Sequence, residues 1–124
     1  MRRAIELYVK TLPLFLAATA CQSAALPVDP AAACSVTVRF GSYAMGIDSA
    51  TAAAVDKLVA ESREVKGVSR SAAGREGEYA LCISTRDAAA ARILFDRIAA
   101  LLPAQPRGPV SVEGAGRRVE AQSR

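Results

Sequence analysis

The sequence contains no histidine and no tryptophan, and its aromatic residues are limited to three Phe and three Tyr. Histidine is the commonest general base and a frequent metal ligand, so its absence removes most hydrolytic and metal-dependent active sites. No G-x-S-x-G, phosphate-loop or dinucleotide-binding motif occurs in the chain. Its carboxylates stand singly, at positions typical of solvated helix faces and helix caps. The sequence therefore predicts a protein that is not an enzyme and that uses no cofactor and no metal.

The chain is also short, with 124 residues, which limits it to one domain. A domain of this size buries only about 60–65% of the surface of its unfolded chain and has no deep cleft between lobes. Half of its net charge of +4 lies within the first twenty residues, where the three positive charges of Arg2, Arg3 and Lys10 exceed the one negative charge of Glu6 by two. The basic balance of the remainder is small, and it predicts no nucleic-acid partner.

The first twenty residues have the parts of an export signal. MRRAIELYVK is a net-positive start, and TLPLFLAATA is an apolar run of ten residues without charge. That run is too short to cross a bilayer, which takes about 20 residues, but it matches the apolar region of a signal peptide. We therefore predict that residues 1–20 are a signal peptide.

The small residues Ala18, Thr19 and Ala20 stand directly before Cys21. This segment resembles the lipobox of bacterial lipoproteins, although that family usually has Leu at the position of Ala18. The resemblance implies that Cys21 is the lipid attachment site, and that acyl chains such as palmitate hold the protein on the periplasmic side of a membrane. Gln22 follows, and by the sorting rule of enterobacterial lipoproteins a residue other than Asp there favours the outer membrane. The alternative is ordinary cleavage after a small residue, which gives a soluble periplasmic protein.

Lipid on Cys21 would leave Cys34 and Cys82 as an even pair. The oxidising periplasm favours a disulfide between them, and no C-x-x-C motif indicates a redox or metal site. The alternation of side chains opposes this bridge. Cys34 has the parity of Val36, whereas Cys82 has the parity opposite to Ile83, so in two regular strands the sulfurs point to opposite sheet faces. A bridge requires Cys34 to lie outside the regular first strand, and the alternative is two separate buried thiols.

Hydrophobic periodicity predicts the elements of one α+β domain. Alternate apolar residues predict two strong strands, and weaker patterns predict two short ones, at 34–40, 78–85, 68–73 and 110–113. Spacings of three and four residues predict helices over 49–65 and 87–102, with an ion pair between Arg92 and Asp96 on the second. The order βαββαβ is that of the ferredoxin-like sandwich, in which two helices cover one face of a four-stranded sheet.

The same patterns divide the rest of the chain. Residues 21–33, rich in Pro and Ala, are predicted to tether the domain to its anchor. The α+β domain is predicted to cover residues 34–113. The polar, glycine-containing residues 114–124 are predicted to be a disordered tail.

Two segments resemble the OmpA-like peptidoglycan-binding family. FGSYAMGIDSATAAAVDKLV resembles the first strand, loop and helix of that family, and VSVEGAG resembles its closing strand and turn. The resemblance implies a cell-wall ligand. Between these segments, GEYALCISTRDAAAARILFDRI lacks the Gly-x-Thr-Asp and Asn-x-x-Leu-Ser-x-x-Arg-Ala segments through which the family binds diaminopimelate. No binding residue is therefore carried over to this chain.

Two functional hypotheses follow. The first is a non-enzymatic envelope lipoprotein whose domain binds a partner protein or serves as an accessory subunit. Its partner would meet the sheet face without helices, where we expect Thr37, Arg39, Ala80 and Ser84. The second is a diverged OmpA-like module that binds peptidoglycan.

The anchoring hypothesis predicts that Cys21→Ser releases the protein from membranes. Lipid is attached through the cysteine thiol, so the variant should incorporate no labelled palmitate and should move to the soluble periplasmic fraction. Cys34→Ser is the control and should stay membrane-bound. Equal fractionation of wild type and Cys21→Ser in the soluble periplasm would contradict the hypothesis.

Overall fold

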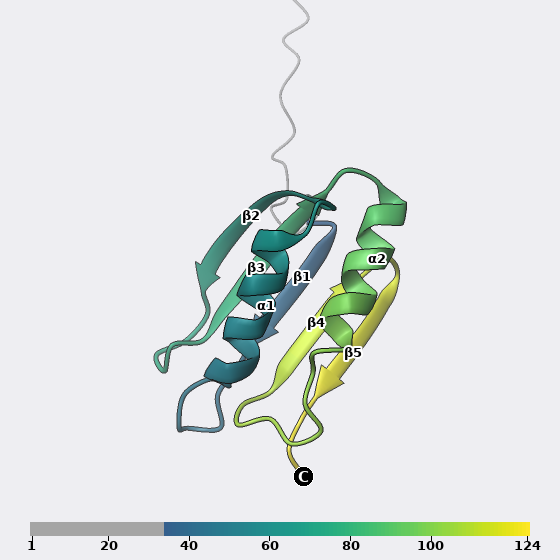
Figure 1. Cartoon of the computed structure of the whole chain (residues 1–124). Coiled ribbons are helices and arrows are strands. Elements are labelled where there is room, and N and C mark those ends of the chain that lie inside the picture. Colours follow the sequence, from purple (N-terminus) through teal and green to yellow (C-terminus); the bar gives the residue numbers. More distant parts are fainter. Residues whose placement is uncertain (1–33) are drawn as a thin grey trace, which may run out of the picture.

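The computed structural model describes residues 34–124, which form two helices on one face of a five-stranded antiparallel sheet (Figure 1). The elements in chain order are β1 (Val36–Phe40), α1 (Ser49–Glu61), β2 (Val65–Ala72), β3 (Tyr79–Thr85), α2 (Ala88–Ala99), β4 (Val110–Gly114) and β5 (Arg117–Ala121). The strands lie in the order β2-β3-β1-β4-β5. The α+β class is confirmed, and the count of four strands is wrong. The predicted signal peptide, Cys21 and the tether lie outside the described residues.

The additional strand, β5, comes from the segment that was predicted to be a disordered tail. It pairs with β4 along its whole length, from Gly114 opposite Arg117 to Val110 opposite Ala121. Ala115 and Gly116 make the turn with φ values of 51° and 72°, the positive region that two-residue hairpin turns require. β5 escaped prediction because a charged edge strand shows little apolar alternation, and RRVEA has one large apolar residue.

The first helix is shorter than its periodicity predicts. α1 ends at Glu61, where Ser62 takes an extended conformation and its hydroxyl donates a hydrogen bond to the carbonyl of Leu58. Val65, which fits the helical spacing, begins β2 instead. The second helix begins at an Asp cap, because the carboxylate of Asp87 accepts a hydrogen bond from the Ala90 N–H at 2.7 Å.

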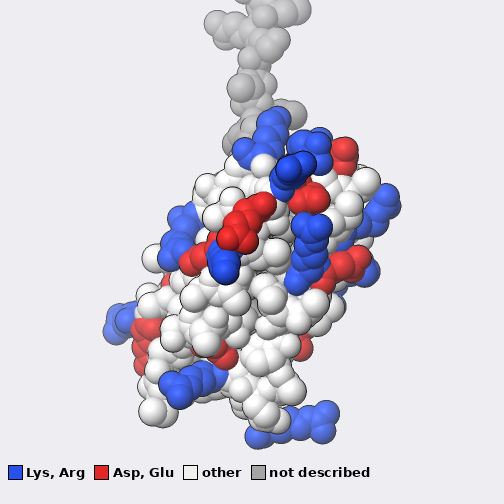
Figure 2. Space-filling model, viewed as in Figure 1, with Lys and Arg blue, Asp and Glu red and all other residues white. Residues whose placement is uncertain are grey.

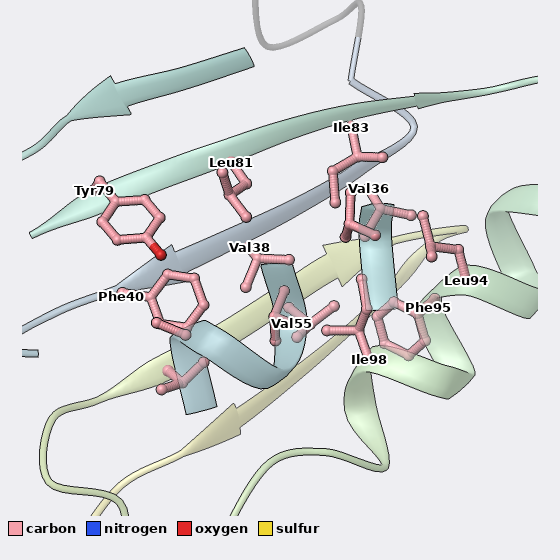
Figure 3. Close-up of a cluster of buried hydrophobic side chains, with 14 of the residues drawn as sticks. Val36, Val38, Phe40, Val55, Tyr79, Leu81, Ile83, Leu94, Phe95 and Ile98 are labelled. Carbon is pink, nitrogen blue, oxygen red and sulfur yellow. The ribbon is translucent and has the colours of Figure 1, made fainter. Parts of the chain in front are cut away.

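The core lies between the helices and the inner strands β1, β3 and β4. Alternate residues of these strands point toward the helices, and eight of them are at most 7% exposed: Val36, Val38, Phe40, Tyr79, Leu81 and Ile83 (Figure 3), with Val110 and Val112 of β4. The helices contribute Val55, Leu94, Phe95 and Ile98 to the same cluster. Each large side chain contributes about 1.5–3 kcal/mol by leaving water.

One charged side chain of β5, Arg117, packs onto the second helix. The guanidinium of Arg117 lies 4.4 Å from the ring centroid of Phe95 and pairs with Asp96 at 2.7 Å. The predicted pair between Arg92 and Asp96 is therefore wrong. Asp96 turns toward β5, where one arginine offers both an ion pair and a cation–π contact.

Asp48 links the start of α1 to the loop before β4. One carboxylate oxygen accepts from the Thr51 N–H at 3.0 Å, and the other accepts from the Arg107 N–H at 3.0 Å. Burial opposes ionisation of this carboxyl group, which is 6% exposed, but the two backbone donors outweigh it and hold its pKa below the ordinary value of 3.8. The adjoining loop is close-packed, because a Cβ atom on Gly108 would lie 2.3 Å from the carbonyl oxygen of Gly41.

We expect Asp48→Ala to lower the free energy of unfolding by about 1–3 kcal/mol, because two buried N–H groups lose their acceptor. Because folding lowers the pKa of Asp48, its ionised carboxylate stabilises the folded state. This stabilisation is fully present at a pH above the ordinary pKa of 3.8 and is lost as the pH falls through the lower pKa of the folded state. Chemical denaturation at pH 7 and at pH 3 should therefore show a smaller loss on acidification in Asp48→Ala than in wild type. The control is Glu61→Ala, an exposed position of α1 without an ion-pair partner among the described residues, which should lose as much stability on acidification as the wild type. An identical acid dependence in Asp48→Ala would contradict the assignment.

Candidate functional site

The sheet face opposite the helices is not covered by any other described element, and we call it the open face. The strand register places on it Gly67, Ser69 and Ser71 of β2, Ala80, Cys82 and Ser84 of β3, Thr37 and Arg39 of β1, Ser111 and Glu113 of β4, and Arg118 and Glu120 of β5. The four residues predicted for this face all lie on it. The serines of β2, Ser111 and the charged residues of β4 and β5 were missed, because only the strand register reveals them.

The side chains of the open face are small, hydroxylated or charged. Two of the predicted residues, Thr37 and Ser84, carry hydroxyl groups, and Ala80 adds only a methyl group. The residues that the register places there include no aromatic residue and no Val, Leu or Ile. The face therefore stays in water without a hydrophobic penalty, and it can recognise another molecule through hydrogen bonds and charge rather than through apolar burial.

Arg39 occupies the middle of the open face. It lies on the central strand, opposite Ala80 on one side and Ser111 on the other, and its side chain is exposed. Within residues 34–124, no acidic group pairs with its guanidinium. Two hollows meet at this residue. One, of about 220 Å³, is lined by Thr37, Ser69 and Ser71, and the other, of about 470 Å³, reaches the turn between β4 and β5.

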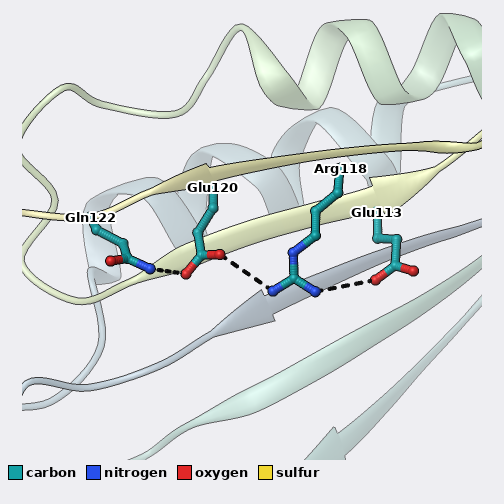
Figure 4. A network of polar contacts seen from close by, with 4 residues as sticks. All are labelled: Glu113, Arg118, Glu120 and Gln122. Atoms are coloured by element: carbon teal, nitrogen blue, oxygen red, sulfur yellow. Dashed lines mark hydrogen bonds and ion pairs between the residues drawn. The ribbon is translucent and has the colours of Figure 1, made fainter.

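The charged side chains at the β5 side of the open face pair with one another (Figure 4). Arg118 lies 3.6 Å from Glu113 and 3.3 Å from Glu120. A hydrogen bond from the Gln122 amide, and a weaker contribution from Arg118, hold the pKa of Glu120 below its ordinary value. Arg39 is therefore the cation of this face that has no internal counter-charge in the described structure.

The helix-covered side of the molecule has a different charge pattern. Figure 2 shows Lys and Arg side chains intermixed with Asp and Glu side chains over the helices. Three ion pairs lie on this side: Arg70 with Asp56 at 3.1 Å, Arg97 with Glu64 at 3.5 Å and Arg117 with Asp96 at 2.7 Å. Mixed charge of this kind presents no continuous basic surface for nucleic acid on the side shown.

Cys34 and Cys82 come together at the edge of the first hollow. Their Cα atoms are 5.1 Å apart and their sulfurs lie at disulfide-bonding distance. The parity conflict disappears because β1 begins at Val36, which leaves Cys34 outside the regular strand. Ser35 makes the bend: its N–H donates to the Ile83 carbonyl at 2.8 Å. The alternative of two separate buried thiols is wrong, since the cysteines are adjacent and half-buried.

No cluster of three His, Cys, Asp or Glu side chains with metal-binding spacing occurs in the part of the chain that the structure describes. The helices of that part are too short and too polar to cross a membrane. Comparisons with protein-family models, with curated proteins and with solved structures return no match. The functional argument therefore depends on the residues of this chain alone.

A bridge between Cys34 and Cys82 closes a loop with a sequence separation of 48 residues. Loop-closure entropy then predicts about 4 kcal/mol of stabilisation, a large part of the stability of a small domain. Reductant should lower the melting temperature markedly, and Cys34→Ala and Cys82→Ala should each reproduce that loss and become insensitive to reductant.

Mass spectrometry of the non-reduced, alkylated protein provides the direct measurement. The expected result is one intact peptide pair that joins Cys34 to Cys82. Alkylation of both cysteines without prior reduction would refute the bridge, and the structure would then hold two neighbouring thiols.

Proposed function

We propose that this chain is an exported cell-envelope lipoprotein without catalytic activity, whose α+β domain binds an acidic partner protein through the open face. The fold proposed for that domain is a ferredoxin-like sandwich extended by β5. The strand order β2-β3-β1-β4, with the first and third strands adjacent at the centre, supports this assignment.

The observation that carries the proposal is the exposed Arg39, which has no ion-pair partner among residues 34–124, at the centre of a polar face that no other described element covers. A guanidinium group presents several N–H donors in a planar fork that matches a carboxylate, and the neighbouring hydroxyls of Thr37 and Ser71 add further donors. Charge complementarity of this kind contributes mainly to specificity and to the rate of association. The chemistry of the face therefore favours a partner that presents Asp or Glu side chains.

The proposed anchor places a limit on where this partner is found. Residues 21–33 span at most about 45 Å when fully extended, at 3.3–3.6 Å per residue. Cys34, where the described chain begins, lies against the open face through its contact with Cys82. A lipid on Cys21 would thus keep the open face within reach of envelope proteins close to the membrane.

A cell-wall ligand is the second candidate. The resemblance of residues 40–59 to the OmpA-like family favours it, and a polymer with sugar hydroxyls and carboxylates has groups that Arg39 and the serines of β2 can bind. The two candidates differ in the molecule recognised rather than in the surface used.

The test compares two charge reversals in the otherwise complete protein. Arg39→Glu changes the open face, and Arg92→Glu is the matched control, because Arg92 is an exposed arginine on α2 without an ion-pair partner among the described residues. A photo-crosslinker at Ser111 should yield a discrete adduct with an envelope protein, reduced about tenfold or more by Arg39→Glu and unaffected by Arg92→Glu.

A charge swap then makes the test specific. Reversing the matching acidic residue of the identified partner should restore binding to Arg39→Glu. Equal adduct yields in both variants would overturn the open-face proposal. Co-sedimentation with purified peptidoglycan that is lost in Arg39→Glu would favour the cell-wall candidate.

A further inference from the structure

The two edges of the sheet differ in how far they are protected from pairing with another chain. β2 forms one edge and, with eight residues, is the longest strand, while β5 forms the other. The outer backbone groups of an edge strand are unpaired, and proteins commonly protect them with charged side chains. On β5, Arg117, Arg118 and Glu120 supply that protection, and all three are held in ion pairs.

β2 lacks such protection over most of its length. Its sequence from residue 67 to residue 72 is GVSRSA, in which the side chains are small apart from Val68 and Arg70. Arg70 is the one charged residue of this segment, against three in β5, and its guanidinium lies 4.0 Å from the ring centroid of Tyr79 and pairs with Asp56 of α1. The irregular pairing between Val65 and Gly67, with Lys66 at its centre, disturbs only the beginning of the strand.

A hollow of about 420 Å³ lies beside this edge, between α1 and β2. Five of its lining residues are apolar, Val59 and Ala60 from the helix and Val65, Val68 and Leu81 from the sheet, and the others are Ser62 and the ion-paired Asp56 and Arg70. Val68 is 48% exposed although it lies on the helix side of the sheet. The helices therefore do not cover the sheet as far as β2, and apolar surface remains in contact with water next to unpaired backbone groups.

We propose that the β2 edge binds an extended segment of a partner chain, which adds to the sheet as a sixth strand with its alternate side chains apolar. Backbone hydrogen bonds to residues 67–72 would supply affinity, and the alternate side chains would supply specificity, as in other cases of strand addition. Side chains on the helix side of the added strand would enter the hollow beside Val68. Those on the other side would extend the open face next to Ser69 and Ser71, where polar residues fit.

The hollow argues against a second copy of this chain as the occupant. On the helix side, β2 itself presents Val68, Arg70 and Ala72. Pairing of two β2 strands would bring only the single Val68 of each copy, next to Arg70, toward the hollow of the other, and Arg70 is already engaged with Asp56. A segment with large aliphatic residues at every second position fills the space that a second copy leaves empty. The proposal is separable from the open-face proposal, since it rests on the outer edge of β2 and the hollow beside Val68 and not on Arg39.

The test uses a synthetic peptide of alternating isoleucine and threonine, capped by glutamate at both ends, and the complete mature protein labelled with nitrogen-15. Titration should shift the amide signals of β2 and leave those of β5 unchanged. Val68→Asp should weaken binding about tenfold or more. Val119→Asp is the matched control, because Val119 is 41% exposed on the helix side of the opposite edge strand, and it should leave the affinity unchanged.

A second peptide, N-methylated at alternate residues, removes the backbone donors while keeping the side chains, and it should not bind wild-type protein. Arg39→Glu should bind the first peptide normally, so that failure of this proposal is separable from failure of the open-face proposal. Absence of saturable binding at millimolar peptide, equal loss in Val68→Asp and Val119→Asp, or shifts centred on β5 would overturn it. Concentration-dependent shifts of β2 without peptide would assign the edge to a second copy.

Discussion

The alternation of side chains on β1 is the constraint from which the rest of the structure follows. β1 is the central strand and pairs with β3 on one side and β4 on the other. Val36, Val38 and Phe40 are buried against the helices, so Thr37 and Arg39 must point to the opposite face. A slip of one residue would exchange the two faces, which fixes the register of the whole sheet. The open face with its central arginine is therefore the necessary counterpart of the core.

The position of the helices over this core explains why the edge strands of the sheet are only partly covered. Two helices of 13 and 12 residues pack over the inner strands, and the outer strands extend beyond them on both sides. The helix layer is thus narrower than the sheet. Because of this mismatch, Val68 and Val119 are 48% and 41% exposed, although both lie on the helix side of the sheet. At β5 the mismatch is offset by Arg117, which covers Phe95. At β2, Arg70 is placed in the same way, over Tyr79 and paired with Asp56, but it leaves Val68 exposed beside the hollow.

The sequence was most informative where one face of an element is fully buried. The strands of the core and both helices were predicted from apolar spacing, because burial imposes a strict period on Val, Leu and Ile. β5 was missed because its stability comes from pairing with β4 and from ion pairs, which leave no periodic signal. The end of α1 was missed because Val65 satisfies both the helical and the strand pattern. The four predicted residues of the open face followed from parity, whereas Ser69, Ser111 and Arg118 required the register.

The position of Cys34 shows where parity ceases to apply. The alternation of side chains that would place Cys34 and Cys82 on opposite faces holds only within a regular strand. The regular strand begins after Ser35, whose N–H donates to the Ile83 carbonyl and whose hydroxyl oxygen accepts from the Thr85 N–H. The chain thus crosses to the open face, where Cys82 lies among small neighbours, Ser69 on one side and Thr37 on the other. Large apolar residues on this face would have filled the space that the bridge requires. The composition that leaves the face open to a partner is therefore the same composition that lets a covalent link fasten the start of the domain to its sheet.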